Sequence, residues 1–118
     1  MYFFNNCKTF DHSKDYGISD AFFDLATTGF QATMATNLSL GETCVVATKE
    51  ADGRIRFAWH ALARVETVPW KDGTHWRVFC GPATKSETLS KAEAARDEVY
   101  SIFFNKNGGF KRQSVLQR

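Results

Sequence analysis

Apolar and polar residues alternate along residues 54–65, in the stretch RIRFAWHALARV. With the two-residue period of a β-strand, one face carries Ile55, Phe57, Trp59, Ala61, Ala63 and Val65. The opposite face carries Arg54, Arg56, Ala58, His60, Leu62 and Arg64. The pattern predicts a strand whose first face packs on a core. Its second face is either a binding surface or the solvated side of the sheet.

Two Asp-Gly pairs flank this run. Asp52-Gly53 joins it to TCVVATKE, and Asp72-Gly73 joins it to THWRVFCG. Asp-Gly between such stretches is a strong hairpin signal, so we predict three antiparallel strands in a meander. The middle strand, which continues to about Val68, is long enough that we expect a bend or a bulge. YFF at 2–4 predicts a short buried first strand, and FKRQSVLQ predicts a closing strand.

Two further stretches have the spacing of helices. Ser19 can cap a helix over about 20–28, which Gly29 would end. Ser90 and Glu93 form a capping box, and apolar residues follow at helical spacing. The predicted order is therefore strand, helix, three strands, helix, strand, which is an α+β fold.

The length and composition predict one domain over residues 1–118, with 43% hydrophobic and 24% charged residues. Eleven Phe and three Trp indicate a core of bulky rings, some of which could line a pocket. The net charge of +2 is too small to indicate nucleic acid by itself. Its distribution says more, because residues 101–118 hold four basic residues and no acid, and residues 43–85 hold seven basic and four acidic residues.

Residues that could carry catalysis or bind a metal do not form a recognisable pattern. Cys7, Cys44 and Cys80 are odd in number and widely spaced, which argues against a disulfide framework and a zinc site. No GxSxG, HExxH or phosphate-binding glycine loop is present in the sequence. We therefore expect a binding domain and no enzyme, no metal and no cofactor. We also expect a cytoplasmic protein without a membrane partner, because no signal peptide and no apolar run of about 18 residues is found.

Four passages resemble the PUA-like superfamily, which includes EVE, ASCH and YTH domains. YFFNNCKTF is similar to the opening strand, above all that of EVE-like domains fused to HNH nucleases. LSLGETCVVATKEADGRIRFAWHALARVETV resembles the turn, central strand and return strand of EVE and ASCH proteins. KSETLSKAEAARDEVYSIFF takes the place of a helix near the C-terminus, and FKRQSVLQ is similar to the closing strand.

This resemblance implies a mostly antiparallel β pseudobarrel with two helices, and a function in binding nucleic acid. The ligand would be RNA, or a modified base flipped into an aromatic pocket, with a nuclease as a candidate partner. The pocket residues implied are Asn5, Asn6, Phe57, Trp59 and His60. The residues expected to hold the nucleic-acid backbone are Arg54, Arg56, Arg64, Lys111 and Arg112.

Two other functions stay open at this point. The same barrel could bind a small planar ligand such as a nucleoside, without salt-dependent affinity for oligonucleotides. Alternatively, the chain could be a protein-interaction domain without a pocket, recognisable by an exposed apolar patch and a stable dimer.

Overall fold

The computed structural model describes residues 1–6, 22–26, 40–70, 73–111 and 115–117. The described residues form mainly strands, with one short α-helix and one turn of 3-10 helix. The elements are β1 Tyr2–Asn5, β2 Phe22–Ala26, β3 Thr43–Lys49, β4 Ile55–Trp70, β5 Gly73–Cys80, β6 Lys85–Leu89, α3 Lys91–Ala95, η1 Tyr100–Phe103 and β7 Val115–Gln117.

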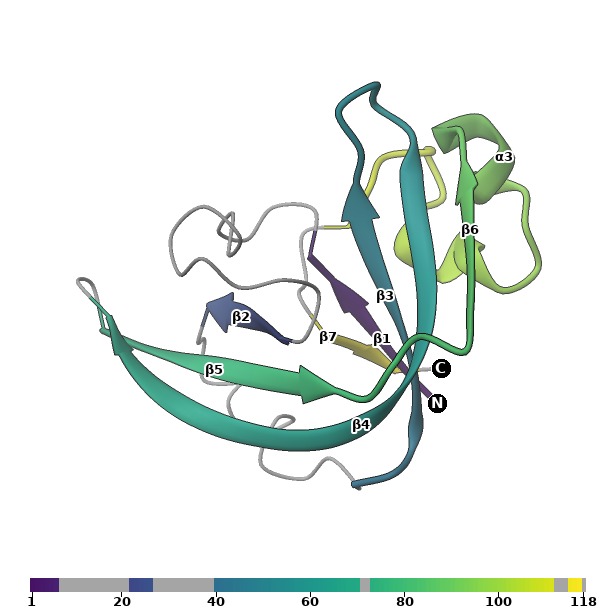
Figure 1. Ribbon diagram of the computed structural model, residues 1–118. Coiled ribbons are helices and arrows are strands. Elements are labelled where there is room, and N and C mark those ends of the chain that lie inside the picture. Colours follow the sequence, from purple (N-terminus) through teal and green to yellow (C-terminus); the bar gives the residue numbers. More distant parts are fainter. Residues whose placement is uncertain (7–21, 27–39, 71–72, 112–114, 118) are drawn as a thin grey trace.

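The strands form one mixed sheet in the order β2-β5-β4-β3-β1-β7, and β6 pairs with β4. The predicted meander of β3, β4 and β5 is confirmed, since both of its pairings are antiparallel. The pairing of β1 with β3 is parallel, whereas β7 runs antiparallel to β1. Figure 1 shows that β4 and β5 curl away from the plane of β1 and β3.

The curl of β4 has a local cause in its pairing with β5. Leu62 lies opposite Cys80, but Arg64 lies opposite Phe79, so Ala63 is an extra residue in the ladder. Such a bulge bends a strand and increases its twist. The predicted bend is therefore confirmed.

This bend overturns the expectation of one wet face along the whole run. Exposure alternates as predicted near the start of β4, where Ile55 and Phe57 are buried and Arg56 is partly exposed. The phase then reverses, because His60 and Leu62 are buried although they belong to the face predicted to be solvated. The curled half of the sheet covers that face.

The two faces of the sheet consequently support two cores. The first core lies between the sheet and the segment of α3 and η1, and its buried residues are Phe3, Val45, Ala47, Ile55, Phe57, Ala94, Tyr100, Phe103, Phe104 and Leu116. The second core lies inside the curl, and its buried residues are Tyr2, Phe4, Cys44, Val46, Leu62 and Val78. Strand β1 alternates between the two cores, which explains why all four of its residues are buried.

The helix predicted over about 20–28 is wrong, because Phe22–Ala26 forms strand β2. All five residues of β2 pair with β5, from Phe22 opposite Phe79 to Ala26 opposite His75. The aromatic pair Phe22-Phe23 suits a strand, and pairing with a neighbouring strand overrides a weak local preference for helix. The predicted caps Ser19 and Gly29 lie outside the described residues.

The helix predicted after Ser90 begins as expected but ends early. The capping box is confirmed, since the Glu93 amide donates to Ser90 Oγ and the Ser90 amide donates to Glu93 Oε1, both at 3.2 Å. The α-helix stops at Ala95, and η1 follows as a separate turn. Asp97 breaks the run, because its Oδ1 accepts from the amides of Val99 and Tyr100 at 2.7 and 3.0 Å.

The sheet does not close into the expected pseudobarrel. Among the described strands, β2 and β7 stand at opposite ends of the order and do not pair with each other. Strand β6, which the sequence did not predict, pairs with residues 55–59 of β4. Strand β5 pairs with β4 only from Leu62 onward. No helix in the described part of the chain is long and apolar enough to cross a membrane.

Candidate nucleic-acid interface

The hairpin between β3 and β4 is the tight turn that Asp52-Gly53 predicts. The Glu50 amide donates to the Arg54 carbonyl at 2.9 Å, and the Gly53 amide donates to the Glu50 carbonyl at 3.0 Å. Gly53 has a φ of 89°, a left-handed conformation that glycine adopts without steric cost. This geometry is a three-residue hairpin loop closed by a glycine bulge.

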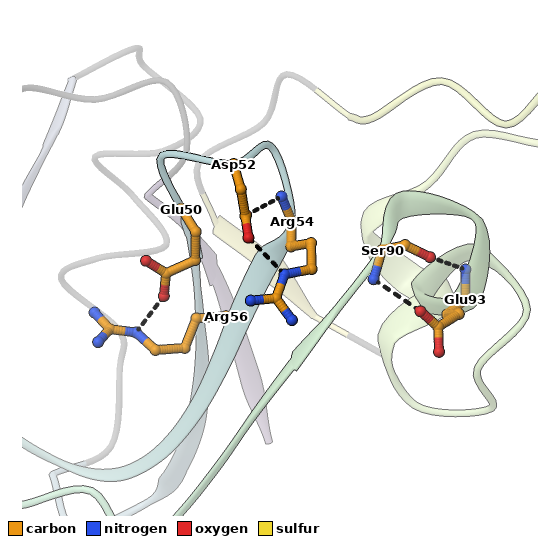
Figure 2. A network of polar contacts seen from close by, with 6 residues as sticks. All are labelled: Glu50, Asp52, Arg54, Arg56, Ser90 and Glu93. Atoms are coloured by element: carbon orange, nitrogen blue, oxygen red, sulfur yellow. Dashed lines mark hydrogen bonds and ion pairs between the residues drawn. The ribbon is translucent and has the colours of Figure 1, made fainter.

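The two arginines of this hairpin each lie beside an acid of the same hairpin (Figure 2). Arg54 Nε is 2.8 Å from Asp52 Oδ2, and Arg56 Nε is 3.6 Å from Glu50 Oε1. Hydrogen bonds from the Arg54 backbone and side chain hold the pKa of Asp52 below its ordinary value. Because the side chains of Arg54 and Asp52 are more than half exposed and those of Arg56 and Glu50 about one third exposed, such pairs hold the arginines only weakly.

The start of α3 lies next to Arg54, as Figure 2 shows. Hydrogen bonds from the Ser90 hydroxyl and amide lower the pKa of Glu93, and the nearby charges of Arg96 and Arg54 lower it further. Glu93 is thus a carboxylate at neutral pH. It limits how much positive charge this side of the hairpin presents.

Two distant segments meet beside the same hairpin. Asn5 ends β1 and lies opposite Ala47 on β3, and its Nδ2 donates to the Lys111 carbonyl at 2.8 Å. The Asn6 amide donates to the Ala47 carbonyl at 2.9 Å. The segment before Lys111 is a turn in which the Gly108 amide donates to the Asn105 carbonyl at 2.9 Å. We call Asn5, Asn6, residues 48–56 and residues 105–111 the hairpin end of the sheet; the connection between β3 and β4 is at the top of Figure 1.

The hairpin end holds more basic than acidic residues. Its acids are Glu50 and Asp52, and its basic residues are Lys49, Arg54, Arg56, Lys106 and Lys111. Lys49 and Lys106 are exposed and were not among the residues singled out from the sequence. Lys49 lies two residues before the turn signal ADG and Lys106 directly before NGG, and this position of lysines flanking turns could have indicated them from the sequence.

The structure separates the remaining candidate arginines from this group. Arg64 lies beyond the bend of β4, where its Nε is 3.2 Å from Glu66 Oε2 and its guanidinium lies 4.2 Å from the centre of the Phe79 ring. Arg112 lies outside the described residues. Arg54, Arg56 and Lys111 are therefore the predicted backbone-binding residues that the structure brings together.

The predicted pocket residues are spread over several places. Asn5 is only 2% exposed and ties β1 to the segment that leads into β7. Asn6 lies beside it and is partly exposed. Phe57 is fully buried and stacks on Tyr100 with 4.1 Å between ring centres, so it is a core residue with no surface left for a base.

Trp59 is the predicted stacking ring that keeps some exposed surface. Its Nε1 donates to Tyr100 Oη at 3.0 Å, and that hydroxyl donates to Glu87 Oε2 at 2.7 Å. Lys85 Nζ lies over the Trp59 ring, 5.2 Å from its centre. Burial is the main cause that raises the pKa of Tyr100 to about 12, so its hydroxyl remains a donor at neutral pH.

His60 lies on the opposite face from Trp59, in the second core. Its Nδ1 is 2.8 Å from the Gly81 carbonyl, and Nδ1 must carry the proton because a carbonyl oxygen only accepts. His60 pairs with Cys44 across β3 and β4. Within the described residues, no three side chains of His, Cys, Asp or Glu are arranged to hold a metal ion.

The geometry therefore offers a basic, turn-rich end of a sheet with an asparagine pair beside it, and an aromatic cluster elsewhere. No protein family, curated protein or solved structure matches this chain.

Proposed function

We propose that this chain binds nucleic acid through the hairpin end of its sheet, as a module related to PUA-like domains. The observation that carries the proposal is that Asn5, which lies opposite Ala47 at the base of the hairpin, donates to the Lys111 carbonyl at 2.8 Å. The two segments joined through Asn5 carry five basic residues, Lys49, Arg54, Arg56, Lys106 and Lys111. Basic side chains on adjacent loops and strands can follow a phosphate backbone.

The ion pairs of Arg54 and Arg56 are compatible with this role. Exposed pairs contribute at most about 1 kcal/mol, so a phosphate can replace Asp52 or Glu50 as the partner. The two acids nevertheless lower the positive potential of the bare surface. Affinity should therefore depend on the balance between these acids and the lysines around them.

Asn6 is the side chain that we assign to reading a base, because it is partly exposed at this end. A side-chain amide has both donors and an acceptor for the edge of a base. Asn5 is assigned the structural part, since its amide already donates to Lys111. The two asparagines, both expected from the sequence to line a pocket, thus have different roles in this proposal.

The first test measures affinity against salt by fluorescence anisotropy, with short RNA and DNA oligonucleotides at three salt concentrations. We expect Lys49→Ala with Lys111→Ala to flatten the slope of log affinity against log salt by roughly one to two units, because each phosphate contact releases counterions. Glu50→Gln with Asp52→Asn should raise the affinity. Asn6→Ala should leave the slope unchanged and weaken binding only to a preferred base.

Arg64→Gln is the control for the single variants Lys49→Ala and Lys111→Ala, because each of the three removes one positive charge but Arg64 lies beyond the bend of β4. An equal loss of affinity in this variant would place the interface elsewhere. Absence of binding to every oligonucleotide below roughly 10⁻⁴ M, the range expected even of non-specific contacts, would reject the proposal.

A further inference from the structure

Two cysteines that are far apart in the sequence meet inside the curl of the sheet. Cys44 is a buried member of the second core, and Cys80 packs against that core from the end of β5. Their strands flank β4 at its bend, with Cys44 opposite His60 and Cys80 opposite Leu62. Residues that pair across strands lie on one face of a sheet, so both cysteines lie on the face of His60 and Leu62 and pack in the second core, although β4 lies between their strands.

The two thiols differ in exposure and in acidity. Cys44 is fully buried, whereas Cys80 is partly exposed and precedes the turn at Gly81 and Pro82. A hydrogen bond between the thiols lowers the pKa of Cys80, and the same bond together with burial raises the pKa of Cys44. The thiolate is the nucleophilic form of cysteine, so this asymmetry gives the two residues different chemical roles.

We propose that Cys80 and Cys44 form an oxidisable pair, in which a hydroperoxide oxidises Cys80 and Cys44 resolves the product into a disulfide. This inference does not depend on the proposed nucleic-acid interface. It rests on the juxtaposition of the two side chains at the bend and on the partial exposure of Cys80.

The chemistry balances with the hydroperoxide as the sole oxidant. The Cys80 thiolate attacks the terminal peroxide oxygen, an S–O bond forms, the O–O bond breaks, and the leaving oxyanion takes a proton to become water or an alcohol. Cys80 is then a sulfenic acid. The Cys44 sulfur attacks Cys80, the S–S bond forms, the S–O bond breaks, and the departing hydroxide takes the Cys44 proton as water.

A disulfide at this place would join β3 to β5 across β4. Its sulfur atoms must approach to about 2.05 Å, closer than hydrogen-bonded thiols, so the bend of β4 must tighten. His60 sits beside this change, because it pairs with Cys44 and contacts the Gly81 carbonyl at 2.8 Å. We therefore expect the oxidised and reduced proteins to differ around β4 and β5.

The experiment treats the full chain carrying Cys7→Ser with hydrogen peroxide, so that Cys44 and Cys80 are the remaining thiols. Intact-mass measurement should show the loss of two hydrogen atoms, and peptide mapping should show a Cys44–Cys80 link within one molecule. With Cys44→Ser added, dimedone should trap a sulfenic acid on Cys80. With Cys80→Ser added instead, dimedone should label Cys44 less than it labels Cys80 in the Cys44→Ser variant, because Cys44 is fully buried and Cys80 is partly exposed.

Three outcomes would overturn the proposal: unchanged thiols after peroxide treatment, a link only between molecules, or equal dimedone labelling of Cys44 and Cys80 in the two variants. Circular dichroism checks that each variant folds. If a serine variant does not fold, the peptide map of the Cys7→Ser protein alone decides, because it needs no change at either proposed residue.

Discussion

At the scale of single residues, Tyr100 shows how one buried polar group joins separate elements. Its hydroxyl accepts from Trp59 on β4 and donates to Glu87 on β6, while its ring stacks on Phe57. A buried tyrosine is stable when its hydroxyl has such partners. Tyr100 was not singled out from the sequence, because nothing in the chain indicates which residues lie opposite it.

Tyr100→Phe should lower the free energy of unfolding by about 1–2 kcal/mol at neutral pH, because the Trp59 N–H loses its acceptor. The pKa of Tyr100 rises from 10.0 to about 12 in the folded protein. The neutral hydroxyl therefore contributes stability that is complete below pH 10 and is lost as the pH rises towards 12. The free energy of unfolding of Tyr100→Phe should therefore fall less than that of the wild type between pH 10 and about 12.

Urea denaturation near neutral pH and at several points across the alkaline window measures both effects. Tyr2→Phe is the control, because it also removes a phenol but neither the bond to Trp59 nor the bond to Glu87. If the free energy of unfolding fell equally with rising alkaline pH in the wild type and in Tyr100→Phe, this account would be contradicted.

At the scale of elements, local signals succeeded where they act over a few residues. The capping box at Ser90 and the turn at Gly53 both form as predicted, since each is decided by side chains and φ angles within the motif itself. The helix predicted over 20–28 failed, because a strand pairing with β5 decides that segment. A helix signal without a long apolar stripe is weak against a neighbouring strand edge.

Ser90→Ala should cost about 1 kcal/mol of stability, the usual cost of losing an N-cap side chain. The Glu93 amide would lose its partner at 3.2 Å and α3 would fray from its first turn. Urea unfolding measures the loss, with Ser86→Ala as the control because Ser86 is exposed on β6. A control variant destabilised as much as Ser90→Ala would argue against a specific capping effect.

At the scale of the whole molecule, the two cores share their strands. Strands β1, β3 and β4 each give residues to both cores, for example Phe3 to the first and Phe4 to the second. Unfolding of either core therefore exposes strands that also carry buried residues of the other core. We expect the protein to unfold in one cooperative transition.

Leu62→Ala should test this coupling. Leu62 is 1% exposed in the second core, so its truncation should cost about 2–5 kcal/mol. Circular dichroism and tryptophan fluorescence should still give coincident denaturation curves. Leu40→Ala is the control, since Leu40 is 67% exposed, and its effect should stay within about 0.5 kcal/mol. Two separated transitions in Leu62→Ala would show that the cores fold independently.

The sequence by itself determined the features that depend on neighbours along the chain. These are the buried first strand, the two hairpins, the capping box and the need for a bend in the long strand. Period, turn residues and length are enough for each of them, because the physical cause lies within the motif. The α+β class followed from their order.

The tertiary structure alone decided what lies on the far side of each strand. Alternation along 54–65 distinguishes two faces, but only the curl at Ala63 shows that His60 and Leu62 are covered. The tertiary structure also decides that the described sheet stays open and that Cys44 and Cys80 pack in the same core. These are contacts between segments distant in sequence, and their geometry depends on the accumulated twist of the whole sheet, which no local pattern encodes.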